Sequence, residues 1–284
     1  MMGKKKEAGD RTMEIGIIGG RGDMGRWFVR FFEREGYTVH IADKDEGMNL
    51  IEMGARCQVV MVSVPISVTT EVIEKIGPAM GKDALLIDIT SLKKEPVESM
   101  LRCARCDVIG CHPLFGPEVP SMEDYSFVVC PARSEKGIWL SWLRTLLQKN
   151  GARLVETTPE EHDRFMSIVQ GLNHFNTMTF GMVMEALGTD IEALQPFMTP
   201  IFEEKIRVIK EVFSHNARMY SEILTRNTYL PAILEQYEET MRELKHLIET
   251  RDAHTLQKRL QDAGARFPDV VRKNPAGGGG GRNR

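Results

Sequence analysis

The stretch EIGIIGGRGDMG, residues 14–25, decides the fold. Its apolar start is typical of a short strand, and Gly20, Gly22 and Gly25 give the spacing G-x-G-x-x-G ahead of a helical run at 26–35. In this motif the first glycine permits a tight turn, the second lets the backbone approach a pyrophosphate, and the third lets helix and strand pack closely. The helix N-terminus adds free N–H groups and a positive dipole. We predict a dinucleotide-binding loop formed by Gly20, Arg21, Gly22, Asp23, Met24 and Gly25.

The next predicted strand, residues 37–42, leads directly into Asp43. A carboxylate about 20 residues past the glycine motif suits a ribose 2′-hydroxyl and repels a 2′-phosphate. We therefore expect NAD rather than NADP, although Lys44 beside Asp43 weakens that preference. The alternative is a plain glycine-rich turn between a strand and a helix.

Strands and helices alternate along the first half of the chain. The nearly continuous apolar run at 58–65 is typical of a strand buried on both faces, and its end places Ser63, Val64 and Pro65 beside the nicotinamide half of a bound cofactor. Further strands are predicted at 84–89, 107–111, 126–130 and 153–155, with helices at 69–76 and 136–149. This alternation predicts an α/β, Rossmann-type, doubly wound and mainly parallel sheet.

Polar side chains lie at or just after the ends of three of these strands. Ser63 lies near the end of the run at 58–65, Ser91 follows 84–89, and His112 follows 107–111. Pro113 has no N–H, so we expect the last of these strands to stop at His112. Ligands bind at the carboxyl edge of a parallel sheet, where His112 would serve as an acid–base group. The alternative is a strand-end histidine that only bonds a loop carbonyl.

From residue 160 onward the pattern is helical. A long helix is predicted from 160 to about 187, followed by helices at 191–197, 200–213, 217–226, 229–249 and 253–265. Gln170 and His174 are four residues apart and so share a helix face. The abundance of Met, Leu, Ile and Phe in this half indicates packing and an interface between subunits. We expect disordered tails at 1–12 and 272–284, a nucleotide-binding domain at 13–158 and an all-α domain at 159–271.

Composition narrows the classes of protein. The 284-residue chain has a net charge of −3, which gives no basic footprint for nucleic acid or for an anionic membrane. No apolar run approaches the ~20 residues of a membrane span, and no signal peptide is apparent, so a cytoplasmic location is expected. Five cysteines in a chain of this length do not form a disulfide framework. The lone pair Cys103 and Cys106, and the spacing of His162 and His174, give no expectation of a metal site.

Several segments together resemble the prephenate dehydrogenases of tyrosine biosynthesis. They are IIGGRGDMGRWF, VVMVSVPISVT, LLIDITSLKKEPVESM, VIGCHPLFGP, GARLVETTPEEHDRFMSIVQGLNHF and RMYSEILTRN, and they occur in the order and spacing of that family. The resemblance implies NAD-dependent oxidative decarboxylation of prephenate to 4-hydroxyphenylpyruvate. It also implies that the helical domain is a dimerisation domain that pairs two subunits into a homodimer.

The same resemblance implies roles for individual residues. His112 matches the catalytic histidine, which accepts a hydrogen bond from the 4-hydroxyl of prephenate and must be neutral to do so. Ser91 matches a serine that shares this hydroxyl and helps to hold the histidine. His174 matches a substrate-binding histidine, with Gln170 one turn before it.

One position departs from the family pattern. The family has an arginine that binds a substrate carboxylate, but the corresponding residue here is Glu211. Arg207 is four residues earlier and on the same helix face, so we nominate it as the substitute. Lys205, Lys210 and Arg218 are the other candidates.

Three other functions remain open. Arogenate dehydrogenase has the same fold and chemistry. A β-hydroxyacid or imine reductase shares the plan of a Rossmann domain and helices, but usually places a lysine on the first helix after the linker, where this chain has histidines and amides. The third alternative is a non-catalytic dinucleotide-binding regulatory protein.

Overall fold

A computed structural model describes residues 13–44, 46–214 and 217–267. The chain forms two compact units, the first ending at Tyr229 and the second beginning at Leu230. The predicted tails at 1–12 and 272–284 lie outside the described residues.

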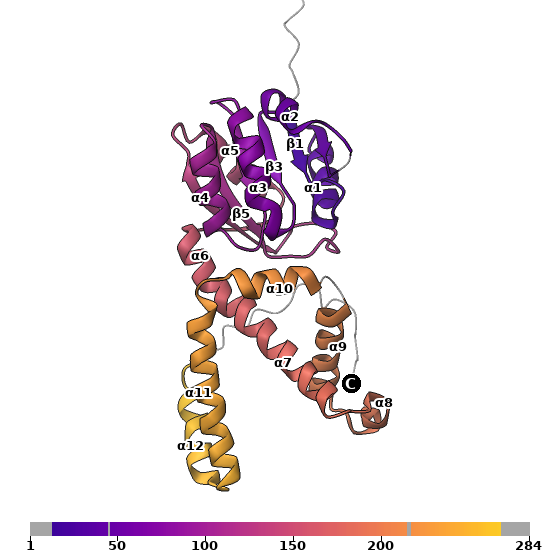
Figure 1. Ribbon diagram of the computed structural model, residues 1–284, viewed down its shortest axis with the longest axis vertical. Helices are drawn as coiled ribbons and strands as arrows, with labels where there is room; N and C mark the ends of the chain where they lie inside the picture. The colour runs from indigo at the N-terminus through magenta and orange to yellow at the C-terminus, as the bar shows by residue number, and fades with distance from the viewer. Residues whose placement is uncertain (1–12, 45, 215–216, 268–284) are drawn as a thin grey trace, which may run out of the picture. The chain divides into compact units, whose positions relative to one another are not determined.

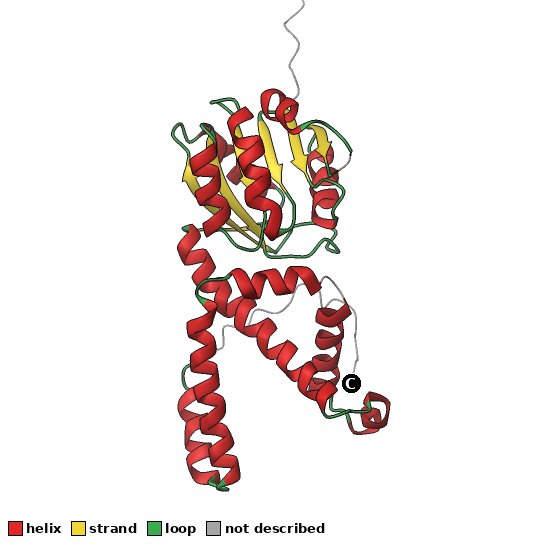
Figure 2. Ribbon diagram, in the orientation of Figure 1, coloured by secondary structure: helices red, strands yellow, loops and turns green. Residues whose placement is uncertain are grey.

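The first unit is built on one mainly parallel sheet, drawn in yellow in Figure 2. Its order is β2-β1-β3-β4-β5-β6-β7, and β6 runs antiparallel to β5 while the other neighbouring pairs are parallel. The strands are β1 (Glu14–Ile18), β2 (Thr38–Ala42), β3 (Val59–Val62), β4 (Leu85–Asp88), β5 (Asp107–Pro113), β6 (Ser126–Arg133) and β7 (Arg153–Glu156). This arrangement, followed by helices, confirms the predicted fold class.

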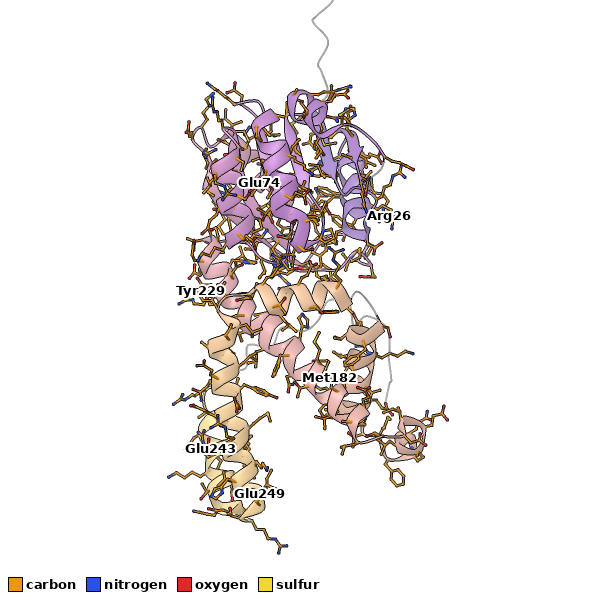
Figure 3. The ribbon with its side chains drawn as sticks, viewed as in Figure 1. Arg26, Glu74, Met182, Tyr229, Glu243 and Glu249 are labelled. Atoms are coloured by element: carbon orange, nitrogen blue, oxygen red, sulfur yellow. The ribbon has the colours of Figure 1, made fainter. Side chains whose placement is uncertain are left out.

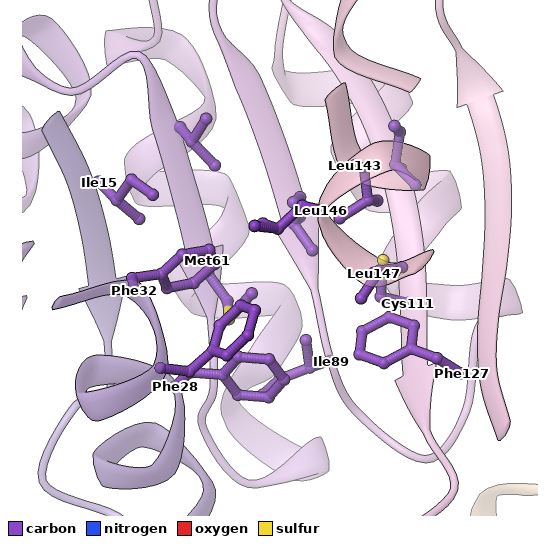
Figure 4. Close-up of a cluster of buried hydrophobic side chains, with 14 of the residues drawn as sticks. Ile15, Phe28, Phe32, Met61, Ile89, Cys111, Phe127, Leu143, Leu146 and Leu147 are labelled. Carbon is purple, nitrogen blue, oxygen red and sulfur yellow. The ribbon is translucent and has the colours of Figure 1, made fainter. Parts of the chain in front are cut away.

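Alternating side chains of the strands feed two apolar cores, one on each face of the sheet. On one face, strand residues such as Ile17 and Met61 pack against α1 (Asp23–Arg34) and α5 (Ile138–Lys149); Figure 4 shows this cluster. On the other face, Val60 and Leu86 belong to the core shared with α2 (Leu50–Arg56), α3 (Ile66–Ile76) and α4 (Lys94–Cys103). Burial on both faces explains the continuous apolar runs of the sequence.

The strand order reverses direction between β1 and β3, and this is where the glycine-rich loop lies. The loop leaves β1 through Gly19, whose φ of +80° is readily adopted only by glycine. A Cβ on Gly19 would lie 2.2 Å from the carbonyl oxygen of Ser63, so the two strand ends are in close contact. In doubly wound sheets this crevice is the place where ligands bind.

His112 lies within β5, so the prediction that the strand stops there is wrong. The ladder continues one residue further, since Pro113 pairs in register with Phe127 of the antiparallel β6. Pro113 has no N–H to give, but the N–H of Leu114 donates to the carbonyl of Ser126 at 3.0 Å and keeps the two strands together. His112 consequently lies inside β5, between Cys111 and Pro113, and pairs in register with Val128 of β6.

Sequence periodicity did not reveal two helices. They are α2 and α4, each short and interrupted in its apolar pattern, by Gly54 in the first and by charged residues in the second. α4 begins at Lys94 immediately after the loop that follows β4. Its N-terminus therefore lies at the same edge of the sheet as His112.

The predicted long helix is divided by a π-helical turn. It consists of α6 (Pro159–Met166), the π-helical turn η2 (Ser167–Leu172) and α7 (Asn173–Ala186). Thr158 caps α6 by accepting the N–H of Glu161 at 3.2 Å, and Pro159 occupies the first turn, where its missing N–H costs nothing. π-Helical turns are rare and are frequent at functional sites.

Three further helices of the first unit follow α7 in the chain (Figure 1). They are α8 (Ile191–Leu194), α9 (Pro200–Ser214) and α10 (Ala217–Arg226), of which α9 and α10 pack against α7. Short 3₁₀ turns lie at Gly77–Ala79 (η1), after α3, and at Gln195–Phe197 (η3), after α8. Phe180 of α7 meets Phe202 of α9 with ring centroids 6.2 Å apart. Gly181 allows the close approach of Phe213, because a Cβ there would lie 2.9 Å from that ring.

The second unit is an antiparallel helical hairpin. It contains α11 (Leu230–Glu249) and α12 (Ala253–Gly264). Asp252 caps α12 by accepting the N–H of Thr255 at 3.0 Å, and Arg259 bonds Glu243 of α11 at 2.7 Å. Figure 3 labels Glu243 and Glu249 on this hairpin. Among the described residues, no helix is both long enough and apolar enough to cross a membrane.

Phe28 tests the core between α1 and the sheet. Its side chain is 1% exposed and its ring lies 6.1 Å from that of Phe32 and 6.4 Å from that of Phe127. We expect Phe28→Ala to lower the free energy of unfolding by about 3–5 kcal/mol, measured by denaturant titration, because it leaves a large cavity. Ile51→Ala is the control, since Ile51 is 67% exposed, and it should change that free energy by less than about 0.5 kcal/mol. Equal effects of the two substitutions would contradict this account of the core.

Candidate active site

The glycine-rich loop is shaped to receive a phosphate group. α1 has Gly22 as its N-cap, and no side chain caps its first N–H groups. A Cβ on Gly25 would lie 2.1 Å from the carbonyl oxygen of Gly19, so only glycine lets α1 start this close to β1. The first turn of α1 therefore offers backbone donors and the positive end of its dipole at the crevice. These features fit the pyrophosphate of a dinucleotide.

Asp43 joins this loop to the end of β2. Its Oδ2 accepts the N–H of Arg21 at 3.1 Å, and its Oδ1 accepts the N–H of Lys44 at 2.9 Å. The Arg21 guanidinium is paired with Glu46. The carboxylate is thus fixed beside the loop.

The end of β3 forms the opposite wall of the crevice. Ser63 donates its N–H to the carbonyl of Ile18 at 2.8 Å, and the Val64 side chain lies close to Gly19. Pro65 is the N-cap of α3, and its carbonyl accepts the hydroxyl of Thr69 at 3.0 Å. Ser63, Val64 and Pro65 thus lie next to the loop, as the parallel pairing of β1 and β3 requires.

His112 is one of several buried ionisable groups at this edge. It is 4% exposed, and its Nδ1 lies 2.9 Å from Nε2 of His162, which is 1% exposed. Burial lowers the pKa of His112 well below its ordinary value, and the neighbouring charges of His162 and Lys93 lower it further. The imidazole is therefore neutral at pH 7 and able to accept a proton.

His162 is in turn held by Asp163. Nδ1 of His162 lies 2.7 Å from Oδ1 of Asp163. The same carboxylate accepts two backbone N–H groups at the start of α4, from Lys93 at 2.7 Å and from Lys94 at 2.9 Å. Asn227, at the end of α10, donates its side-chain N–H to the backbone carbonyl of Asp163 at 2.9 Å. Three elements thus fix the position of this one residue.

A buried ion pair lies near the two histidines, and the charge of its lysine, Lys93, acts on both of them. The ammonium of Lys93 contacts Oδ1 of Asp88, and both side chains are fully buried. Burial raises the pKa of Asp88, while the Lys93 charge and the N–H and hydroxyl of Thr90 oppose that rise. In the described part of the chain, Oδ2 of Asp88 has no hydrogen-bond partner.

Ser91 lies at the same edge but does not hold His112. It follows Thr90 in the loop after β4 and is partly exposed. Among the described residues no hydrogen bond joins Ser91 to His112, whose Nδ1 is taken by His162 instead. The expectation that Ser91 orients the histidine is therefore not met in this structure, and its contact with a substrate hydroxyl stays a prediction.

Gln170 and His174 lie where the π-helical turn joins α7. Oε1 of Gln170 is buried, and within the described residues it has no hydrogen-bond partner. His174 packs edge-on against Tyr220 of α10, with ring centroids 4.8 Å apart, and burial lowers its pKa. A neutral histidine and an unused amide oxygen can both bond a polar ligand.

Arg207, the nominated carboxylate-binding residue, lies on the surface of α9. Its guanidinium is paired with Glu204 at i−3, with Nε 2.9 Å from Oε2, and its side chain is 66% exposed. Glu211 is one turn further along α9. Burial raises the pKa of Tyr220, and the charges of Glu211 and Glu118 raise it further. Arg207 would have to leave Glu204 to bind a ligand.

Arg218, by contrast, joins α10 to the first turn of α3. Its Nε donates to Glu222 at 2.8 Å and its Nη2 lies 2.7 Å from the hydroxyl of Ser67. Glu222 also accepts the N–H of Ser67 at 3.1 Å, near the start of α3. α10 is therefore docked onto the first turn of α3, at the carboxyl edge of the sheet.

Several of these residues were not assigned from sequence. His162 was noted, but neither its bond to His112 nor the roles of Asp163, Tyr220 and Asn227 were predicted. The adjacent His162 and Asp163, in the first helix after the sheet, are the only local signal in the sequence for the roles of these two residues. No group of three or more His, Cys, Asp or Glu side chains in the described ranges is arranged to hold a metal ion.

Two family models match most of this chain. Residues 33–156 match the family model described as "Prephenate dehydrogenase, nucleotide-binding domain", and residues 158–262 match "Prephenate dehydrogenase, dimerization domain". The chain belongs to the prephenate dehydrogenase family. The resemblance read from the sequence motifs is thereby confirmed, whereas the roles of single residues are not tested by it.

Curated members of the prephenate dehydrogenase family resemble most of this chain. A "Probable arogenate/prephenate dehydrogenase" of Methanocaldococcus jannaschii is 31% identical over 279 residues, which cover 92% of this chain. The "T-protein" of Haemophilus influenzae is 32% identical over 239 residues, which cover 84% of this chain. The chain spans 63% of the length of each of these two relatives.

Solved structures of the family share the fold. Prephenate dehydrogenase of Aquifex aeolicus, in complex with hydroxyphenyl propionate and NAD+, superposes with a TM-score of 0.70 at 20% identity, covering 90% of this chain and 97% of that one. Synechocystis arogenate dehydrogenase gives 0.69 at 19% identity, covering 89% and 98%.

The buried histidines make stability depend on pH. The folded-state pKa values of His112 and His162 are lowered, whereas in the unfolded chain both titrate near about 6.5. Below that pH the unfolded chain binds protons that the folded chain does not, so the free energy of unfolding falls, by up to about 1.4 kcal/mol per pH unit for each histidine. We expect His112→Asn to flatten this slope between about pH 6.5 and pH 5, in denaturant titrations at each pH. His254→Asn is the control, since His254 is exposed. Parallel slopes for His112→Asn and the parent protein would show that His112 does not titrate abnormally.

Proposed function

We propose that the protein catalyses the NAD-dependent oxidative decarboxylation of prephenate to 4-hydroxyphenylpyruvate. The observation that carries this proposal is the buried, neutral His112, bonded through Nδ1 to His162 at the edge of the sheet that carries the glycine-rich loop. Family membership supports the same reaction. The domain division that goes with it is a nucleotide-binding domain at 13–158 and a helical substrate and dimerisation domain at 159–271, in a cytoplasmic enzyme.

The residues of the crevice fit NAD as the cofactor. The loop from Gly20 to Gly25 would take the pyrophosphate, Asp43 the adenosine ribose, and Ser63–Pro65 the nicotinamide side. NAD, when bound, supplies an acceptor for the hydride of the substrate. A carboxylate at position 43 disfavours the 2′-phosphate of NADP, which supports NAD.

The chemistry assigned to His112 is that of a general base. Its neutral imidazole accepts the hydrogen bond of the 4-hydroxyl and takes that proton as the hydroxyl carbon becomes a carbonyl carbon. Burial keeps water away, so the hydrogen bond is stronger than it would be in solvent. Ser91, two residues beyond Ile89 at the same edge, is the second group proposed to bond the hydroxyl.

The helical elements would hold the rest of the substrate. We assign His174 and Gln170 to substrate binding. Oε1 of Gln170 is buried without a hydrogen-bond partner among the described residues, and His174, whose pKa is lowered by burial, packs against Tyr220 of α10. Exposed apolar side chains support a homodimer through the helical domain, as the dimerization-domain match suggests. Met182 of α7, labelled in Figure 3, is 54% exposed, and Phe197 is 81% exposed.

Arogenate is the second candidate substrate, and one observation favours it. Glu211 replaces the arginine expected from the family, and the charges of Glu211 and Glu118 both act on Tyr220, which packs against His174. An acidic group near the substrate side chain would attract the ammonium of arogenate and repel the carboxylate of prephenate. The relative Methanocaldococcus jannaschii protein carries both substrates in its name.

Reduction of the cofactor tests the function. Protein mixed with NAD+ and prephenate should give NADH absorbance and 4-hydroxyphenylpyruvate, and a parallel assay with arogenate ranks the two substrates. His112→Asn should bind NAD+ unchanged but lower kcat by about 10²–10⁴-fold, the usual worth of a positioned acid–base group. If the folded protein reduces neither NAD+ nor NADP+ when it is given either substrate, a non-catalytic nucleotide-binding protein is favoured. Activity within tenfold of the parent in His112→Asn would remove His112 from the catalytic role.

The carboxylate-binding residue is tested by two arginine substitutions. If Arg207 binds a substrate carboxylate, Arg207→Ala raises KM for prephenate by about 10–100-fold, which corresponds to one charged hydrogen bond. Arg218→Ala is the comparison, because Arg218 is already bonded to Ser67 and Glu222. An unchanged KM in Arg207→Ala would move the role to Arg218, Lys205 or Lys210.

A further inference from the structure

The side chains of His112, His162 and Asp163 form one buried hydrogen-bonded chain. Its two links measure 2.9 Å, from Nδ1 of His112 to Nε2 of His162, and 2.7 Å, from Nδ1 of His162 to Oδ1 of Asp163. A neutral imidazole has one nitrogen that donates and one that accepts. If the group at one end of this hydrogen-bonded chain can only accept or only donate, it determines which nitrogen of each histidine carries the proton.

Asp163 is the committed end. Both of its oxygens accept backbone N–H groups at the start of α4, from Lys93 and from Lys94. A backbone N–H can only donate, and the positive end of the α4 dipole stabilises the ionised carboxylate. A carboxylate in this state has no proton to offer, so the nitrogen of His162 that faces it must carry one.

The tautomer of His162 in turn determines the tautomer of His112. With a proton on Nδ1, the neutral His162 has a bare Nε2, which accepts a hydrogen bond from Nδ1–H of His112. The proton of His112 is thus on Nδ1, and its Nε2 keeps a free lone pair. Nε2 has no hydrogen-bond partner among the residues that the structure describes, so it is available to a ligand.

We propose that Asp163 is a positioning residue that, through His162, keeps His112 in the tautomer with an unprotonated Nε2. The proposal builds on the proposed function, because the free Nε2 is the atom that would take the hydroxyl proton. In that step the hydroxyl O–H bond breaks, an N–H bond forms at Nε2, and the electron pair of the O–H bond stays with the substrate oxygen. His112 becomes an imidazolium, and the charge of Asp163 stabilises it through His162.

The other ionisable groups near the two histidines are either paired with each other or neutral. From β4 and the loop after it, Asp88 and Lys93 face the histidines, but they form their own ion pair. The thiols of Cys111 and Cys130 on β5 and β6 are buried, and burial raises the pKa of each, to about 12 for Cys130, so both are neutral. Asp163 is therefore the anion that hydrogen-bonds into the chain.

Capping of α4 alone is the simpler role, and Asp163→Asn separates it from the proposal. The amide keeps the shape of the side chain but has one acceptor oxygen instead of two and no charge. The N–H groups of Lys93, Lys94 and His162 then compete for that oxygen, so the order of protons along the chain is lost. A change of aspartate to asparagine beside a catalytic histidine acts in this way in serine proteases.

Nitrogen NMR of labelled histidines reads the tautomer without any substrate. In the parent protein we expect His112 to show a protonated Nδ1 and an unprotonated Nε2, and in Asp163→Asn a mixture of tautomers. A protonated Nε2 on His112 in the folded parent protein would overturn the proposal. Because this readout needs no turnover, it is decisive even if neither prephenate nor arogenate proves to be the substrate.

Kinetics gives the second readout. Asp163→Asn should lower kcat by about 10–10³-fold with KM for NAD+ unchanged. The acid limb of kcat/KM should move to lower pH, since removal of an anion disfavours the imidazolium and lowers the pKa of His112. Asp163→Glu keeps the charge and should recover part of kcat.

Asn227→Ala is the matched control. It removes a hydrogen bond to the backbone carbonyl of the same residue without changing its charge. We expect lower stability but a tautomer and an acid limb like those of the parent. If Asp163→Asn and Asn227→Ala reduce kcat equally and leave the acid limb in place, Asp163 only caps α4 and the proposal is wrong.

Discussion

The site depends on one interaction, the bond between the Asp163 carboxylate and the first N–H groups of α4. A helix start leaves such groups without partners, and here the partner comes from α6, a helix outside the sheet domain. The same carboxylate holds His162, and His162 holds His112. The end of one helix thereby determines the state of an imidazole on β5.

Buried polar groups are costly unless they are paired, and this edge of the sheet contains several. Burial lowers the pKa of His112, and the positive charge of Lys93, which is paired with Asp88, lowers it further. Gly110 makes room for this pair, because a Cβ there would lie 3.2 Å from the Lys93 side chain and 3.3 Å from Asp88 Oδ2. A neutral histidine at neutral pH is the combined result.

The sheet could be predicted from the sequence because its signals are local. Apolar runs, a glycine motif and proline placements specify strands and turns, and the parallel order brings Ser63, Ser91 and His112 to one edge. α4 was missed because charged residues interrupt its short apolar pattern. The partner of His112 was missed for a different reason. His162 is 50 residues away in the chain, and only the docking of α6 onto α4 brings the two rings together.

The π-helical turn η2 sets the rotational phase between two histidines of the same helical column. Each residue of an α-helix advances the side chain by about 100°, so the number of residues between His162 and His174 decides whether they face one way or two. The π-helical turn at Ser167–Leu172 has i→i+5 hydrogen bonds, so the side chains after it point in different directions than they would after a regular α-helix. His162 can thus face the sheet while His174 faces Tyr220. Loss of one residue from this turn would leave every helix intact and yet turn the part of the helix that carries His174 away from the part that carries His162.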